Sequence, residues 1–262
     1  MKQYGHACAL ARALDVVGDR WSLLIVRELL LRDQCRYTDL KNGLPGIATN
    51  LLADRLRELE AAGVIRRQQA PPPIATTVFD LTERGRALER VVLELGFWGA
   101  PLLATAAPDD HVRLYWYGLW IRHKLQDHAP KQPGTTLELR ADGDDVPLIL
   151  EIGDGAVRTR VHSRARPDAT LTGPARAVAA VITGRSPLSA ARAKGVRYTG
   201  DPAILARVQP AAVGNLQRRA SAASEPGDRS APAKRRARAR VGESEGRSPS
   251  GKKGTKHPPA PV

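Results

Sequence analysis

The sequence predicts an α+β protein with two domains and a basic tail. Residues 1–104 show amphipathic helical patterns followed by one β-hairpin pattern. Residues 105–214 show strand patterns separated by Asp-Gly turns, and short helical patterns follow them. Residues 215–262 hold almost no bulky apolar side chain and are predicted to be disordered. A chain of 262 residues is long enough for two domains of ordinary size and an extension.

Three helices are predicted before residue 48. Residues 8–17 form an amphipathic pattern that stops at Gly18, and residues 37–41 form a short helix before a turn at Pro45. Between them, residues 21–31 form a very apolar helix. Its expected buried side chains are Trp21, Leu24, Ile25, Leu29 and Leu30.

Residues 49–63 predict a capped helix with one apolar stripe. Leu52, Leu56 and Leu59 follow the i, i+4, i+7 spacing and should face a core. Thr49 can cap the first turn, and Gly63 can close the last turn in the left-handed conformation. The pattern alone also fits an ordinary surface helix. The short helix and turn before it favour a helix-turn-helix.

A β-hairpin pattern follows this helix directly. Residues 64–68 and 77–81 predict two strands, which would form a wing beside the helix-turn-helix. The tip, residues 69–76, contains neither Arg nor Lys, which argues against a cationic wing-tip contact in the minor groove. Residues 82–103 then predict one long helix. We expect it to join the two domains and to contribute to a dimer contact.

The order of motifs in residues 1–104 resembles that of the HxlR-type winged helix-turn-helix transcriptional regulators. This resemblance implies a dimeric bacterial regulator that binds a roughly palindromic double-stranded DNA operator. The motifs include Gly18-Asp19-Arg20-Trp21, Arg27-Glu28-Leu29, Tyr37-Thr38-Asp39-Leu40, Leu44-Pro45-Gly46-Ile47, Asn50-Leu51-Leu52 and Leu81-Thr82-Glu83-Arg84-Gly85.

The first turns of a recognition helix reach base edges in the major groove. Asn50 can pair bidentately with adenine, and Thr49 can meet a thymine methyl or a phosphate. Arg55 could reach a guanine or tie the helix to its neighbours. Asp54 could accept from cytosine or restrain Arg55 or Arg57. The predicted phosphate contacts are Arg36, Thr38, Lys41, Arg66 and Arg67, each of which could equally be a solvated surface residue.

Two cysteines, Cys8 and Cys35, are too few for a disulfide framework and lack the close pairing of a zinc site. No metal or cofactor is therefore expected. The family resemblance implies a redox- or electrophile-sensing thiol at Cys8, whose pKa Arg12 could lower. The alternative is a small buried core residue.

The second domain begins with an aromatic segment. Residues 109–126 hold four of the eleven aromatic residues and predict a buried helix. The strands at 136–141, 147–152, 156–162 and 170–173 predict an antiparallel meander. The remaining predicted elements are helices at 175–183, 188–193 and 202–208 and a strand at 196–199.

Short motifs of this domain resemble the sterol-carrier-protein family over about residues 110–210. They include Pro167-Asp168-Ala169-Thr170, Ile182-Thr183-Gly184-Arg185 and Tyr198-Thr199-Gly200-Asp201. The resemblance implies a twisted sheet covered by helices, with an apolar tunnel between them for a small hydrophobic effector. The candidate lining residues are Trp116, Trp120, Ile149 and Val181, each of which could instead be plain core.

The basic charge is concentrated in the tail. Residues 1–104 carry 14 Lys and Arg against 12 Asp and Glu, residues 105–214 carry 15 against 11, and residues 215–262 carry 12 against 4. The run from Lys234 to Arg240 could raise the non-specific affinity for DNA, or the tail could simply solubilise the chain.

The sequence therefore favours a homodimeric, sequence-specific DNA-binding transcriptional regulator controlled by an apolar effector. A lipid or hydrophobic-ligand carrier, whose head serves protein interaction, is the alternative. An enzyme is the least favoured reading, since no catalytic constellation stands out. No apolar run approaches the roughly 20 residues of a membrane span, so we expect a cytoplasmic, nucleoid-associated protein without a membrane partner.

Overall fold

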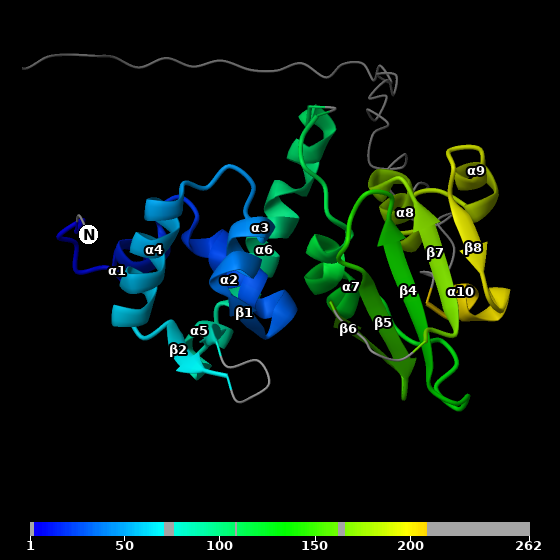
Figure 1. The fold of residues 1–262 in the computed structure, drawn as a ribbon, viewed down its shortest axis with the longest axis horizontal. Coiled ribbons are helices and arrows are strands. Elements are labelled where there is room, and N and C mark those ends of the chain that lie inside the picture. The colour runs from blue at the N-terminus through cyan, green and yellow to red at the C-terminus, as the bar shows by residue number, and fades with distance from the viewer. Residues whose placement is uncertain (1–2, 71–75, 108, 162–165, 209–262) are drawn as a thin grey trace, which may run out of the picture. The chain divides into compact units, whose positions relative to one another are not determined.

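The computed structural model describes residues 3–70, 76–107, 109–161 and 166–208 (Figure 1). These residues belong to one compact unit of the chain. The predicted disordered tail at 215–262, with its basic run, lies outside the described residues, as does most of the wing tip.

Four helices open the chain and surround one apolar core. They are α1 (Ala9–Val17), α2 (Ser22–Arg32), α3 (Tyr37–Gly43) and α4 (Thr49–Ala61). The stripe of Leu52, Leu56 and Leu59 on α4 is buried, which confirms the predicted core face. On α2 the prediction is only partly right, because Ile25 is fully buried but Leu24 remains 40% exposed.

The ends of α4 differ in how well the sequence predicted them. Ala48 is the N-cap and Thr49 is the first helical residue, so the predicted cap by the Thr49 side chain is wrong. At the other end Gly63 has a φ of 67°, as predicted. The Val64 amide donates to the Leu59 carbonyl at 2.9 Å, which forms a Schellman closure. Gly63 thereby turns the chain directly into the wing.

The wing consists of β2 (Ile65–Gln69) and β3 (Thr77–Leu81), which pair antiparallel as predicted. A further short strand that the sequence did not reveal, β1 (Gln34–Arg36), pairs with the other edge of β3. The strand order is thus β1-β3-β2. Through this third strand, the segment between α2 and α3 is hydrogen-bonded to the wing.

The predicted continuous helix over residues 82–103 is wrong. The chain forms α5 (Glu83–Arg86), then α6 (Glu89–Gly99), then a 3₁₀ segment η1 (Ala100–Thr105) that has proline in its first turn. Thr82 caps α5 by accepting from the Gly85 amide at 3.1 Å. On α6 and η1, several large apolar side chains are exposed, among them Val91, Leu95, Trp98 and Leu102.

The predicted helix over residues 109–126 is also shorter than expected. It consists of a 3₁₀ segment, η2 (Leu114–Tyr117), followed by α7 (Gly118–Lys124). The expected burial is confirmed for Leu114 and Tyr115, whereas Trp116 and Trp120 are only half-buried. This difference leaves the two indoles available at a surface, as described below.

The five-stranded sheet of the second region has the order β6-β5-β4-β7-β8. Its strands are β4 (Thr135–Ala141), β5 (Leu148–Gly153), β6 (Ala156–Arg160), β7 (Ala169–Gly173) and β8 (Arg197–Thr199). Strands β4 to β6 form the predicted antiparallel meander. The prediction fails at β7, which pairs parallel to β4, because the connection from β6 crosses to the opposite edge of β4.

Three helices complete the fold: α8 (Ala175–Ile182), α9 (Leu188–Arg192) and α10 (Pro202–Val208). In Figure 1, α8, α9 and α10 lie beside β4, β7 and β8. Val181 on α8 and Ile149 on β5 are 0% and 3% exposed, so both belong to the core between helices and sheet. That they line a ligand tunnel stays a prediction.

One buried ion pair fastens α10 to the chain that leaves α7. Arg207 donates through Nη2 to Asp127 Oδ2 at 2.9 Å and through Nε to Oδ1 at 2.5 Å. Asp127 also accepts the backbone amides of Ala129 and Gly155. These bonds hold the pKa of Asp127 well below its ordinary value, and the bond from Arg207 has the largest effect.

Candidate nucleic-acid interface and adjoining cavities

The first turn of α4 presents a polar, solvent-exposed surface. Thr49 and Asn50 are both exposed. The Tyr37 hydroxyl donates to the Thr49 carbonyl at 2.7 Å and so fixes where the helix begins. Asn50 Oδ1 accepts from the Leu51 amide at 2.9 Å, while the side-chain NH₂ group of Asn50 has no hydrogen-bond partner among the described residues. The first turn of α4 therefore exposes an amide and a hydroxyl side chain.

Arg55 is held by carboxylates of the chain itself. Its Nη1 lies 2.5 Å from Asp19 Oδ2 and also pairs with Glu58, and its side chain is 18% exposed. In this geometry Arg55 ties α4 to the segment before α2. Asp54 pairs with Arg57 on the exposed face one turn away, which is the restraint that the sequence suggested as one of its two roles.

The five predicted phosphate contacts fall into two groups. Arg36, Thr38 and Arg67 line one surface hollow of about 390 Å³ between the start of α3 and the wing. The other two are held internally: Lys41 Nζ donates to the Ile47 carbonyl, and Arg66 forms two bonds to Asp80, at 2.7 and 2.8 Å. The structure therefore brings three of the five together beside α3.

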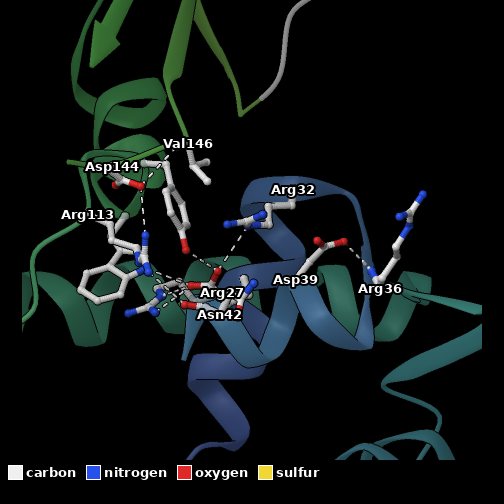
Figure 2. A network of polar contacts seen from close by, with 11 residues as sticks. Arg27, Arg32, Arg36, Asp39, Asn42, Arg113, Asp144 and Val146 are labelled. Carbon is white, nitrogen blue, oxygen red and sulfur yellow. Dashed lines mark hydrogen bonds and ion pairs between the residues drawn. The ribbon is translucent and has the colours of Figure 1, made fainter. Parts of the chain in front are cut away.

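The sequence did not reveal a buried acidic residue on α2. Glu28 is 0% exposed and accepts from the Tyr115 hydroxyl at 2.8 Å and the Trp116 Nε1 at 3.0 Å (Figure 2). Arg27 Nη2 donates to Glu28 Oε1 at 2.7 Å, and Arg32 Nε lies 3.4 Å from Glu28 Oε2. The helix-turn-helix and the η2 segment of the second region are thus joined through one carboxylate, which we call the Glu28 network: Arg27, Glu28, Arg32, Tyr115 and Trp116.

The surroundings of Glu28 leave no room for other side chains. A Cβ added at Gly43, the last residue of α3, would lie 2.2 Å from Glu28 Oε2. Next to it, Arg113 donates to the Asn42 carbonyl at 3.1 Å and pairs with Asp144 at 2.9 Å. The end of α3 is therefore also bonded to the second region (Figure 2).

Tyr115 acts as a hydrogen-bond donor in this network. Burial, reinforced by the neighbouring Glu28 charge, raises the pKa of Tyr115 above its ordinary value. The hydroxyl consequently keeps its proton at neutral pH. A sequence signal for the network existed, since an acidic residue lies on the apolar stripe of α2, but its partners are 87 and 88 residues away along the chain.

Two adjoining cavities lie where α6 and η1 face η2, α7 and α8. Their volumes are about 620 and 380 Å³. Trp116 lines both cavities and Trp120 lines the smaller one, whereas Ile149 and Val181 line neither. The residues common to both cavities are Leu103, Trp116, Tyr117 and Arg185.

The two cysteines have opposite environments. Cys8 is exposed at the start of α1, so the alternative of a buried core residue is wrong. The backbone amides of Ala11 and Leu10 lower its pKa, whereas Arg12 lies beside Asp15 at 3.6 Å. Burial raises the pKa of the Cys35 thiol. Only Cys8 combines access and an acidified thiol.

Two further findings concern the described part of the chain only. It contains no group of three or more His, Cys, Asp or Glu residues arranged to hold a metal ion. None of its helices is both long enough and apolar enough to cross a membrane.

Comparison with known families gives two matches that follow each other along the chain. Residues 16–106 match the model described as HxlR-like helix-turn-helix, and residues 123–212 match that of the SCP-2 sterol transfer family. Both resemblances predicted from the sequence are confirmed. The α+β class, with a winged helix-turn-helix followed by a sheet-containing region, agrees with them.

Similar proteins carry regulator names. The uncharacterized HTH-type transcriptional regulator sll1512 of Synechocystis sp. is 35% identical over 99 residues, which cover 38% of this chain and 73% of that protein. The HTH-type transcriptional regulator YodB of Bacillus subtilis is 34% identical over 86 residues, covering 33% and 76%. A solved structure of reduced YodB from B. subtilis, 30% identical, covers 39% of this chain and all of its own, with a TM-score of 0.33.

Proposed function

Because the chain belongs to the HxlR-like helix-turn-helix family, we propose that it binds one DNA operator sequence as a homodimer and regulates transcription there. The observation that carries this proposal is the exposed polar first turn of α4, next to the hollow lined by Arg36, Thr38 and Arg67. A helix that presents such a turn over an apolar core can enter the major groove while neighbouring cations contact phosphates.

Within this proposal the residues divide by role. Asn50 reads an adenine and Thr49 contacts a thymine methyl or a phosphate, because both are exposed at the end of α4 that leads into the groove. Arg36, Thr38 and Arg67 contact phosphates. Lys41, Arg66, Arg57 and Asp54 are weaker candidates, because each would have to give up a bond within the chain.

The dimer contact is assigned to the exposed apolar side chains of α1 and α6. Leu10 and Trp98 are 68% and 73% exposed, and Val91 and Leu95 are about half exposed. Large apolar side chains exposed on a helix, such as those of α6, are typical of an interface. Sedimentation equilibrium should give the mass of a dimer, and Trp98→Glu should shift it towards the monomer. A wild-type monomer at micromolar concentration would contradict this assignment.

The second region is proposed to bind a small apolar effector that changes DNA affinity. The match of residues 123–212 to the SCP-2 sterol transfer family and the cavities beside Trp116 and Trp120 support this role. The Glu28 network supplies a physical connection to α2. Mass spectrometry of small molecules released from the purified chain should identify an apolar compound. A chain purified empty from its native cells would argue for a structural role instead.

Footprinting on the promoter of its own gene tests the regulator proposal. We expect one protected, roughly palindromic site at moderate salt, and it should persist when residues 217–262 are deleted, with weaker binding to all sequences alike. Smeared protection that disappears with the tail would instead favour the alternative, a hydrophobic-ligand carrier whose head contacts other proteins.

A second role is proposed for Cys8 as a thiol that senses oxidants or electrophiles. Its exposure and lowered pKa favour reaction at neutral pH, whereas Cys35 is buried. Titration of the native chain with a chromogenic disulfide reagent should show one fast thiol, which Cys8→Ser removes. Two thiols reacting at the same rate would rule out the selectivity that a sensor needs.

A further inference from the structure

The two adjoining cavities have walls from both matched regions of the chain. The first match, residues 16–106, supplies Val92, Phe97 and Leu103, and the second, residues 123–212, supplies Ala180 and Thr183. Trp116 and Trp120, from η2 and α7 between the two matches, complete the walls. The walls are therefore aromatic and aliphatic. Volumes of about 620 and 380 Å³ are within the range of small-molecule sites. An occupant would contact the helix-turn-helix region and the second region at once.

The rim of the cavities is unevenly charged. Arg176 and Arg185 both reach it, and Arg185 borders both cavities. Arg176 donates to the Ala107 carbonyl at 2.7 Å, and Arg185 donates to Thr183 Oγ1 at 3.1 Å. Among the described residues, neither guanidinium has a carboxylate partner.

The other charged groups at the rim are already engaged. Arg27 is bonded to Glu28, and the Asp110 carboxylate accepts the Ala107 amide at 2.8 Å. His111 also lines the larger cavity. Asp110 keeps its negative charge, because its bond is to a neutral amide, so Arg176, Arg185 and Asp110 together leave a net charge of +1 at the larger cavity. Both arginines are bonded to neutral oxygens, and Arg185 is the one that borders both cavities. A carboxylate or sulfonate would give either of them a stronger, charge-assisted partner.

We propose that the joined cavities bind a small apolar molecule with one acidic group, which Arg185 recognises while the aromatic walls enclose the body. This inference rests on the proposed effector role and specifies its site and ligand class. It moves the effector from the core between sheet and helices, where Ile149 and Val181 are fully packed, to the contact between the two regions.

The position of Trp116 explains how an occupant would reach the DNA-binding region. Its ring lines both cavities, its Nε1 donates to the buried Glu28, and the Arg27 guanidinium lies 4.4 Å from the ring centroid. A ligand that turns this indole must change the bonds of Glu28 on α2. The effector and the operator would then favour different arrangements of the same contact.

The site can be tested with two fluorescent probes on the full chain. 8-Anilinonaphthalene-1-sulfonate carries an acidic group, and N-phenyl-1-naphthylamine is its neutral counterpart. We expect the wild type to bind the sulfonate more tightly than the neutral probe. Arg185→Gln should weaken binding of the sulfonate about 10-fold and leave binding of the neutral probe unchanged. Arg192→Gln, on the exposed surface of α9 and away from both cavities, should alter neither.

A second pair of variants tests whether the probes occupy this cavity. Gly96 lines the smaller cavity and Gly99 lines neither, and a Cβ at either glycine of α6 meets no atom within 4 Å. Gly96→Leu should therefore displace both probes, and Gly99→Leu should displace neither. Equal effects of the two leucines, or equal losses in Arg185→Gln and Arg192→Gln, would overturn the inference.

Operator binding, measured separately, distinguishes the two proposals. If the probe pattern appears as expected but the sulfonate leaves operator affinity unchanged, the cavity stands as a binding site and its effector role fails. If the operator is bound specifically and the probe pattern is absent, the regulator proposal stands and the site assignment fails.

Discussion

The outer face of α4 and the Glu28 network place polar side chains in opposite surroundings. On α4, Thr49 and Asn50 are exposed above a core of leucines, so their polar groups are free to meet a partner. In the network, a charged carboxylate is fully buried and has four donors around it. The first surface can be changed without disturbing the fold, whereas the second cannot.

This contrast separates recognition from communication. Side chains that read a base must be exchangeable with solvent, because DNA replaces their water. Side chains that connect two regions must keep one arrangement, and a buried polar group is costly unless every bond is made. Under the proposed function, exposed residues of the chain would serve the first task and buried ones the second.

The largest expected effect comes from Glu28→Ala. It leaves Arg27 and Arg32 without their buried partner and removes the acceptor of Tyr115 and Trp116. Breaking a buried ion pair costs about 3–5 kcal/mol, so urea unfolding should show a loss of that size. Glu94→Ala, an exposed glutamate on α6, is the control and should stay within about 0.5 kcal/mol of wild type. Equal losses in both variants would remove the contrast.

The next effect is a loss of stability in acid that depends on Asp127. Its folded-state pKa is depressed by Arg207, so its contribution is fully present above the unfolded-state value of about 3.9. The contribution is lost as the pH falls below that value towards the folded-state pKa. The free energy of unfolding should decrease steeply over this range in wild type and less steeply in Asp127→Asn. Parallel pH profiles would assign the acid sensitivity to other groups.

A smaller and more selective effect is expected at the DNA surface. Asn50→Ala should reduce discrimination at one base pair by about 1–3 kcal/mol without changing the unfolding midpoint. Arg67→Gln, by comparison, should weaken binding to all DNA sequences alike and reduce the slope of log affinity against log salt concentration by about 1. Titrations against the operator and its single-base variants measure both. Identical profiles for the two variants would contradict the roles assigned to them.

The smallest effect concerns Arg55. Because its partner Asp19 is 46% exposed, the pair should contribute only about 0.2–1 kcal/mol. A double-mutant cycle with Arg55→Ala and Asp19→Ala should recover this coupling, with base preference unchanged. Relaxed base specificity in Arg55→Ala would instead make Arg55 a base reader. The ion pair with Asp19 would then exist only in the DNA-free protein.

Much of the helix-turn-helix could be predicted because its signals are local. The leucine spacing of α4, the glycine at its end and the two wing strands all depend on residues close together in sequence. The exposed candidates Asn50 and Thr49 could be chosen for the same reason. The cap at the start of α4 was misassigned by one residue, since Thr49 already has its place in the helix.

The rest depends on contacts between distant residues. Strand β1 is three residues long and exists only because β3 accepts it, and β7 is parallel to β4 through a connection whose course no local pattern indicates. Trp116 and Ile149 have similar apolar character in the sequence, yet one lines a cavity and the other is core. Tertiary packing determines which of the two positions a residue takes, and the spacing of apolar residues in the sequence carries no information about it.

The bond from Arg113 to the Asn42 carbonyl lies one residue before the end of α3 and six residues before Ala48, the N-cap of α4. α4 has 13 residues and is about 20 Å long, so a small rotation at this turn would displace the far end of α4 more than its start. If the second region controls DNA affinity as we propose, it can do so through the inclination of α4, with the side chains of its first turn unchanged.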